Sequence, residues 1–125
     1  MLFPSAPAAA VASLRELLAS PRNIAIITHY NPDGDAMGSS LGLCAVLKKL
    51  GHDARVVLPN TPPLNLHWIP GADQAIAHDR QKEACDRAVR ECDVLFCLDF
   101  NKPDRVGGLE DAVRAAGTKV LIDHH

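Results

Sequence analysis

Histidine and aspartate residues follow three separate apolar segments of this 125-residue chain. The segment IAIIT leads into His29, Asp33 and Asp35, the segment VLFCL leads into Asp99, and the segment KVLI leads into DHH at 123–125. Clustered carboxylates would repel one another and take up protons unless cations compensated their charge. Imidazole mixed with carboxylate oxygen suits manganese, iron or zinc better than calcium. The pattern therefore indicates a divalent-metal site if the three segment ends meet.

Alternating strands and helices predict that these ends do meet. Short apolar runs predict strands at 24–28, 53–59, 75–78, 93–100 and 119–123, the one at 75–78 being the weakest. Helical periodicity and punctuation by Gly and Pro predict helices ending near Ser20 and over 36–50, 80–91 and 109–116. This order favours an α/β fold, a mostly parallel sheet flanked by helices on both faces.

The carboxyl ends of parallel strands meet along one edge of a sheet, where such folds bind ligands. Asp99 follows a strand that lies between the other two in sequence, which makes it a candidate to bridge two ions. Two ions about 3.5–4 Å apart that share a carboxylate form the arrangement used for displacement at phosphorus. We expect Asp35 to cap the helix that begins near Ala36, and Gly38 and Gly42 to let that helix lie close to the sheet.

Each of these residues also has an ordinary structural interpretation. An Asp before a helix is usually a cap, an Asp in a turn usually a turn residue, and a single His usually a satisfied polar group. All of these interpretations would have to hold at three strand ends at once, which argues against them as a joint explanation. The other histidines are not grouped with further potential metal ligands, so we expect His52, His67 and His78 to be structural or surface residues. We expect Trp68 to fill the core beneath the long loop.

Composition excludes several classes of protein. With 47% apolar and 22% charged residues the chain is globular, and a net charge of -2 creates no basic field for nucleic acid. The four cysteines show no CxxC spacing, and the apolar neighbours of Cys97 indicate a small buried apolar residue. Both observations favour a reducing compartment. The N-terminus lacks a basic leader, and the charge-free stretch 36–47 is too short to span a bilayer. We expect a soluble, cytoplasmic protein.

Three motifs resemble, in order, the first three motifs of the DHH family of phosphoesterases: HYNPDGDAMGS, LDF followed by RVGG, and the terminal DHH. The resemblance runs from Ile24 to the end of the chain and its motifs are highly specific. It is strongest to short bacterial enzymes that act as oligoribonuclease and as phosphatase for 3'-phosphoadenosine 5'-phosphate, rather than to RecJ exonucleases. It implies a three-layer, Rossmann-like fold and a hydrolase for short RNA or DNA oligonucleotides or nucleotides.

The resemblance also implies two cations, expected to be manganese, with magnesium or cobalt as alternatives. They would be held by His29, Asp33 and Asp99 on one side and by Asp35, Asp99 and His124 on the other. A water activated by both cations would attack phosphorus.

Three further residues receive roles from the same resemblance. His125 would contact the scissile phosphate, and Asp123 would support the site as an outer partner of a ligand or through the turn it starts. Arg105 would pair with an acid or with the phosphate, a plain surface salt bridge being the alternative.

Family members continue with a fourth motif and a C-terminal substrate-binding domain. We therefore expect residues 1–125 to be the N-terminal part of a DHH phosphoesterase domain, weakly active or inactive alone. One alternative is a manganese-dependent inorganic pyrophosphatase, although such enzymes generally lack the extended NPDGDA-GS form. Another alternative is a non-catalytic fragment that binds a nucleotide or a partner. The sequence leaves open the physiological substrate, the direction of degradation and whether the protein forms a homodimer.

Overall fold

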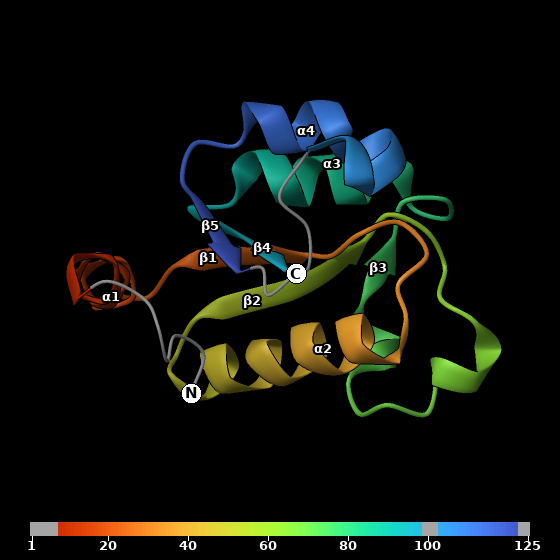
Figure 1. The fold of residues 1–125 in the computed structure, drawn as a ribbon, viewed down its shortest axis with the longest axis horizontal. Helices are drawn as coiled ribbons and strands as arrows, with labels where there is room; N and C mark the ends of the chain where they lie inside the picture. Colours follow the sequence, from red (N-terminus) through yellow and green to blue (C-terminus); the bar gives the residue numbers. More distant parts are fainter. Residues whose placement is uncertain (1–7, 99–102, 123–125) are drawn as a thin grey trace.

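A single parallel sheet forms the centre of the molecule. The computed structural model describes residues 8–98 and 103–122. The strand order is β3-β2-β1-β4-β5, and every neighbouring pair is parallel (Figure 1). The strands are β1 (Asn23–Ile27), β2 (Asp53–Leu58), β3 (Ile76–Ala77), β4 (Val94–Leu98) and β5 (Lys119–Ile122). The predicted parallel sheet is therefore confirmed, including its short third strand.

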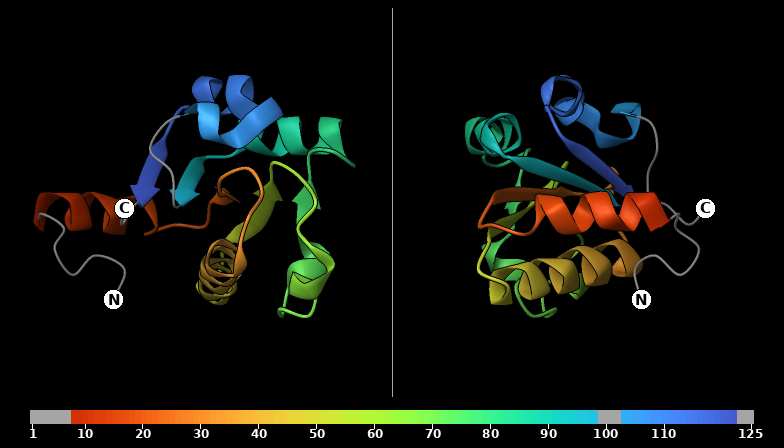
Figure 2. Two further views of the ribbon diagram at one scale, coloured as in Figure 1. Left: turned by 45° about the vertical axis from the view of Figure 1, so that its right-hand side comes forward. Right: turned by 90° about the vertical axis from the view of Figure 1, so that its left-hand side faces the viewer.

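Helices cover both faces of this sheet. Figures 1 and 2 show α2 along one face and α3 and α4 along the other. The helices are α1 (Ala8–Leu17), α2 (Gly34–Lys49), α3 (Lys82–Glu91) and α4 (Glu110–Ala115). Residues of α1 join the core on the α2 side. The fold is α/β with three layers, as expected, and none of the described helices has the length and hydropathy to cross a membrane.

The central strands explain why their sequences are apolar without alternation. β4 is buried along its whole length, and β1 is buried from its second residue onward. Ile26 and Phe96 belong to the core under α2, whereas Ile27 and Cys97 belong to the core under α3 and α4. A strand covered on both faces needs apolar side chains at every position. Cys97 is fully buried, which confirms it as a packing residue, and this burial raises the pKa of its thiol to about 12.

The strand β5 is less buried than its sequence predicts. Its residues alternate between exposed and partly buried, and Leu121 is 57% exposed. β5 lies at the edge of the sheet and pairs with β4 alone among the described strands. An edge strand has one neighbour instead of two, so less of its surface is removed from water.

The face of α2 that packs on the sheet is not the glycine face. Gly38 and Gly42 are exposed, and a Cβ at either would meet no atom within 4 Å, so the predicted close approach there is wrong. Larger side chains make the contact instead: Met37, Leu41, Leu43, Cys44 and Leu47 belong to the core. Gly51 ends this region with a φ of 94°, which confirms the predicted left-handed position.

The predicted role of Trp68 as a core residue is wrong, because its side chain is 77% exposed. It lies between two short 3-10 helices, η1 (Leu64–Leu66) and η2 (Ala72–Gln74). A turn joins Leu66 to Ile69, whose N–H donates to the Leu66 carbonyl at 3.3 Å. Residues three apart in such a turn share one side, so Leu66 and Ile69 pack against the core and Trp68 faces away.

Candidate active site

The strand order brings together the three strand ends that carry the predicted site. β1 pairs with β4 and β4 pairs with β5, all in the same direction, so their carboxyl ends lie side by side at one edge. His29, Asp33 and Asp35 follow β1 within the described part of the chain. The other predicted site residues on these strand ends, namely Asp99, Asp123, His124 and His125, lie outside the described residues.

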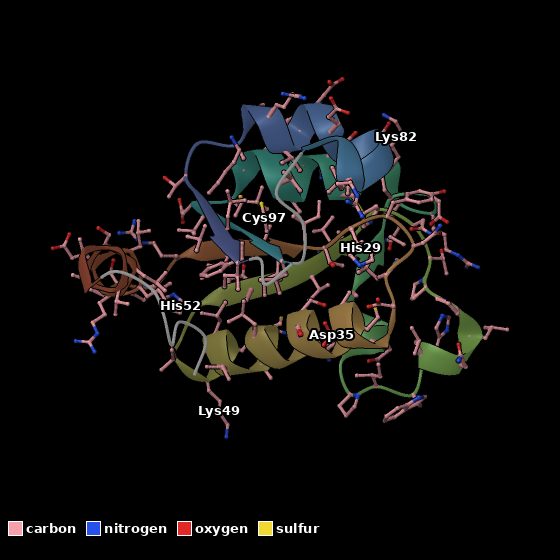
Figure 3. The ribbon with its side chains drawn as sticks, viewed as in Figure 1. His29, Asp35, Lys49, His52, Lys82 and Cys97 are labelled. Carbon is pink, nitrogen blue, oxygen red and sulfur yellow. The ribbon has the colours of Figure 1, made fainter. Side chains whose placement is uncertain are left out.

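His29 is the first predicted metal ligand after β1, and Figure 3 shows it at the opposite end of the sheet from His52. Its Nδ1 lies 2.9 Å from the backbone oxygen of Tyr30. A carbonyl oxygen can only accept a hydrogen bond, so Nδ1 must be the protonated nitrogen in this contact. Nε2 of the neutral ring then carries the lone pair, and it has no hydrogen-bond partner within the described residues. Nε2 is therefore the ring nitrogen that keeps a lone pair for a further partner.

Asp33, rather than the expected Asp35, is the N-cap of α2. Its Oδ1 accepts a hydrogen bond from the N–H of Ala36 at 2.8 Å, and its extended backbone precedes the first helical residue, Gly34. Asp35 lies one residue inside the first turn, where the positive end of the helix dipole favours a carboxylate. Capping uses one oxygen of Asp33, and among the described residues its Oδ2 has no donor. A structural role and a ligand role are thus compatible at Asp33.

Neighbouring loops hold the segment between His29 and Asp33 from two sides. On one side, the Asn31 N–H donates to Asn60 Oδ1 at 2.7 Å and Asn60 Nδ2 donates to Asn31 Oδ1 at 2.9 Å. On the other side, the Tyr30 N–H donates to the carbonyl oxygen of Arg105 at 2.7 Å. The prediction from sequence missed Asn60. It directly follows the strand run VVLP, so the rule that strand ends meet at one edge would have pointed to it.

Arg105 contributes its backbone to this edge. It precedes Gly107 in η3 (Pro103–Leu109), whose conformation is interrupted at Val106 and Gly107, and its side chain is exposed. The hydrogen bond from Tyr30 is made to its carbonyl oxygen and does not involve the guanidinium. Pairing of that guanidinium with an acid or a phosphate stays a prediction.

Two observations bear on whether a metal fits here. The Thr28 hydroxyl, directly before His29, is fully buried without a hydrogen-bond partner among the described residues, so this point of the edge is suited to a further polar group. No three His, Cys, Asp or Glu residues within 8–98 and 103–122 lie close enough to hold a metal ion. The donor set of His29, Asp33 and Asp35 suits a divalent cation chemically. A complete site would need donors from the neighbouring strand ends.

The remaining histidines have structural or surface positions, as predicted. His52 is buried and its Nδ1 accepts from the Arg22 N–H at 3.1 Å. His78 is buried beside Asp86, with Nε2 and Oδ1 2.9 Å apart, and exposed His67 contacts a backbone carbonyl.

Comparison with known proteins identifies the family. The family model described as DHH family, N-terminal domain, matches residues 23–125. The Thermus thermophilus protein named bifunctional oligoribonuclease and PAP phosphatase NrnA is 38% identical over 104 residues, which cover 82% of this chain and 28% of that protein. A crystal structure of an exopolyphosphatase-related protein from Bacteroides fragilis matches with a TM-score of 0.93 and 36% identity over 98% of this chain and 36% of the other. The chain thus spans about a third of the length of these relatives. It belongs to the DHH family.

Proposed function

We propose that this chain is the N-terminal, metal-binding part of a phosphoesterase that hydrolyses short oligonucleotides and nucleotide 3'-phosphates. The observation that carries the proposal is the adjacency of β1, β4 and β5, because it brings the carboxyl ends of all three strands to one edge. The Thermus relative, named for oligoribonuclease and PAP phosphatase activity, supports this substrate class.

Each ligand comes from one of these strand ends. His29 and Asp33 would hold one cation with Asp99, and Asp35 would hold a second with Asp99 and His124. The Nε2 of His29 and the Oδ2 of Asp33 are the atoms that the local hydrogen bonds leave for this purpose. Two bound cations, expected to be manganese, would supply positive charge that lowers the pKa of an attacking water and neutralises the phosphate.

Other residues of the chain would act on the substrate. His125 would donate a hydrogen bond to an oxygen of the scissile phosphate and stabilise the charge that develops there. Asp123 would orient a neighbouring ligand, as partners of metal-binding histidines commonly do. Arg105 would attract the phosphate from the rim, since its side chain is exposed beside the loop that carries His29.

Hydrolysis of a diribonucleotide by the full-length protein tests the proposal. We expect turnover with Mn²⁺, none in excess chelator, and none in Asp99→Ala. The matched control is Asp93→Ala, because Asp93 borders the same strand at its amino end, where its carboxylate accepts from the Asn23 N–H at 2.8 Å. Turnover in Asp99→Ala, or equal turnover in chelator, would refute the metal-dependent mechanism.

Phosphoanhydride hydrolysis is a second candidate. The Bacteroides relative is named as exopolyphosphatase-related, and the motif pattern is shared with manganese-dependent pyrophosphatases. Pyrophosphate and polyphosphate therefore belong in the same assay as the diribonucleotide. A kcat/KM higher for either anhydride than for the diribonucleotide would favour this candidate.

The isolated chain is expected to be much less active than the full-length protein. It spans 28% of the Thermus relative, so most of that protein has no counterpart here. Equal turnover by the isolated chain would show that the remainder is dispensable, whereas nucleotide binding without turnover would support a non-catalytic module. We also propose a cytoplasmic location, which the four free thiols support.

A further inference from the structure

The loop that carries His29 and Asp33 contains one residue in an unusual backbone conformation. Asn31 has a φ of 57°, the only positive φ among the described non-glycine residues. Asparagine tolerates this left-handed region better than most residues, but an isolated loop would still populate other conformations. Contacts outside the loop must therefore select the observed conformation.

Asn60 makes the contact that is specific for this conformation. It accepts from the Asn31 N–H at 2.7 Å and donates from Nδ2 to Asn31 Oδ1 at 2.9 Å, so both the backbone and the side chain of Asn31 are held. The two amides form a reciprocal pair between the β1 and β2 ends. Rotation about the Asn31 N–Cα bond would move the side chain relative to the N–H, so the two bonds to Asn60 could not both be kept.

Asn60 is itself anchored to the sheet. The next residue, Thr61, donates its N–H and its hydroxyl to Asp79, with the hydroxyl 2.8 Å from Oδ1. Asp79 directly follows the buried His78, which is the first residue after β3. The ends of β1, β2 and β3 are thus joined in sequence by Asn31–Asn60 and Thr61–Asp79. Asn60 therefore fixes the loop that carries His29 and Asp33 relative to the sheet.

The opposite side of the loop is held by the residue between His29 and Asn31. The Tyr30 N–H bonds to Arg105, and its ring lies against Gly107, where a Cβ would come within 2.9 Å of Tyr30 Cδ1. The Tyr30 carbonyl accepts from His29 Nδ1. Tyr30 and Asn31 are consecutive, so a twist at Asn31 reorients the peptide whose oxygen aligns the imidazole.

We infer that Asn60 is a positioning residue, which holds the β1–α2 loop in its metal-binding conformation through its reciprocal amide pair with Asn31. The inference rests on the proposed metal-dependent function. Asn60 itself would not touch the metal. It raises metal affinity because the loop does not have to be ordered when the cation binds, and outer partners of metal ligands commonly contribute 10–100-fold to affinity.

Manganese titration by calorimetry on the full-length protein tests the inference. In Asn60→Ala we expect the Kd for Mn²⁺ to rise about tenfold or more, with the far-UV circular dichroism spectrum unchanged. The matched control is Asn65→Ala, because Asn65 is exposed in η1 of the same connection and makes no hydrogen bond among the described residues. We expect that control to bind Mn²⁺ like the wild type.

Two further variants separate positioning from general destabilisation. Asn60→Asp should restore affinity to near the wild-type value, since one oxygen can accept from the Asn31 N–H and the Asn31 amide can turn to donate to the other. Asn31→Gly adopts a positive φ freely but lacks the side-chain bond. If the two residues act as a pair, Asn31→Gly/Asn60→Ala should lose no more affinity than Asn60→Ala alone.

The outcomes distinguish this inference from the proposed function. A wild-type protein that binds no Mn²⁺ overturns both. Binding by the wild type together with an unchanged Kd in Asn60→Ala overturns the positioning role alone. A raised Kd in Asn60→Ala that Asn60→Asp does not restore also overturns it, because the loss would then not arise from the amide pair.

Discussion

The two ends of the sheet carry the same residue types but use them differently. At the amino end, His52 Nδ1 accepts from the Arg22 N–H and Asp93 Oδ2 accepts from the Asn23 N–H. Both side chains satisfy backbone donors where β1 begins, and His52 is buried there. At this end, His52 Nδ1 and the Asp93 carboxylate complete the hydrogen bonding of the backbone, while the buried His52 Nε2 has no partner among the described residues.

At the carboxyl end the corresponding side chains bond within their own loop. His29 Nδ1 bonds to Tyr30 and Asp33 Oδ1 bonds to Ala36, and in each case the second polar atom of the side chain faces no donor or acceptor among the described residues. The comparison teaches that residue type does not distinguish a structural histidine or aspartate from a functional one. For the histidines, the distinction lies in which ring nitrogen keeps its lone pair. His52 Nδ1 accepts, so its buried Nε2 carries the proton and has no partner among the described residues, whereas His29 Nδ1 donates and leaves the lone pair on Nε2.

Paired alanine substitutions of the two histidines give the largest expected contrast. His29→Ala should weaken Mn²⁺ binding by more than the roughly 10–100-fold that outer partners contribute, because a direct ligand is lost, and should abolish turnover with little change in stability. His52→Ala should leave Mn²⁺ affinity unchanged and destabilise the fold by about 1–3 kcal/mol, since the partly buried Arg22 N–H loses its acceptor. Calorimetry and urea unfolding measure the two effects. Equal losses of affinity would contradict the division between the ends.

Asparagine at Asp33 sharpens the comparison by separating capping from charge. Asn caps helices about as well as Asp, so Asp33→Asn should keep the stability of α2 while weakening Mn²⁺ binding at least tenfold. Asp33→Ala should lose the affinity and also about 1 kcal/mol of stability.

The matched change at the amino end is Asp93→Asn. It keeps an oxygen to accept from the Asn23 N–H, so it should alter neither the stability nor the Mn²⁺ affinity. Undiminished Mn²⁺ affinity in Asp33→Asn would show that its carboxylate acts as a cap alone. Thermal unfolding and calorimetry on the three proteins decide between these results.

Two glycine substitutions extend the contrast to the backbone. Gly107 has a φ of 56° and faces the Tyr30 ring, so Gly107→Ala should destabilise the protein by about 1–3 kcal/mol. Gly38 is exposed within α2 with open space at its Cβ, so Gly38→Ala should stabilise it by about 0.5–1 kcal/mol. Urea unfolding measures both. A neutral Gly107→Ala would mean that the loop next to Tyr30 can adjust.

The smallest expected effect concerns His78 and Asp86, an imidazole–carboxylate pair with a structural role. Burial would raise the pKa of Asp86, but hydrogen bonds from His78 and Lys82 outweigh it and hold the pKa below its ordinary value. The ionised carboxylate therefore adds stability above its unfolded pKa of about 3.9, and this contribution is lost as the pH falls through the lower folded pKa. Asp86→Asn should melt earlier than the wild type at neutral pH, with the difference disappearing in strong acid. A constant difference at both pH values would exclude this origin.

Much of the fold follows from patterns that the sequence displays locally. Unbroken apolar runs such as VLFCL predicted strands with both faces covered, and β4 has this burial. The predictions failed where a side chain had a choice of direction. Trp68 was expected in the core because its neighbours are apolar, but the turn from Leu66 to Ile69 turns those two inward and leaves Trp68 exposed.

The placement of the candidate residues after β1 was predictable for the same reason, whereas their role as metal ligands stays a prediction. His29, Asp33 and Asp35 were identified because they follow a buried strand in a recognisable motif. Which carboxylate caps α2 depends on where the first helical turn closes, and that is a matter of one residue's backbone angles. The position of Asn60 after β2 made it a candidate for the same edge, but its contact with Asn31 joins positions 29 residues apart, so no local pattern predicted that contact.

The sequence by itself determined which segments are buried and which polar residues follow them, because apolar periodicity and turn chemistry act between near neighbours. Only the tertiary structure decided that β4 lies between β1 and β5, since pairing of strands distant in sequence depends on how helices pack on the two faces. It also decided that His52 Nδ1 accepts from a backbone N–H, while His29 Nδ1 donates to a carbonyl and leaves the lone pair on Nε2. A side chain's role is set by which backbone groups the folded chain brings within hydrogen-bond distance of it.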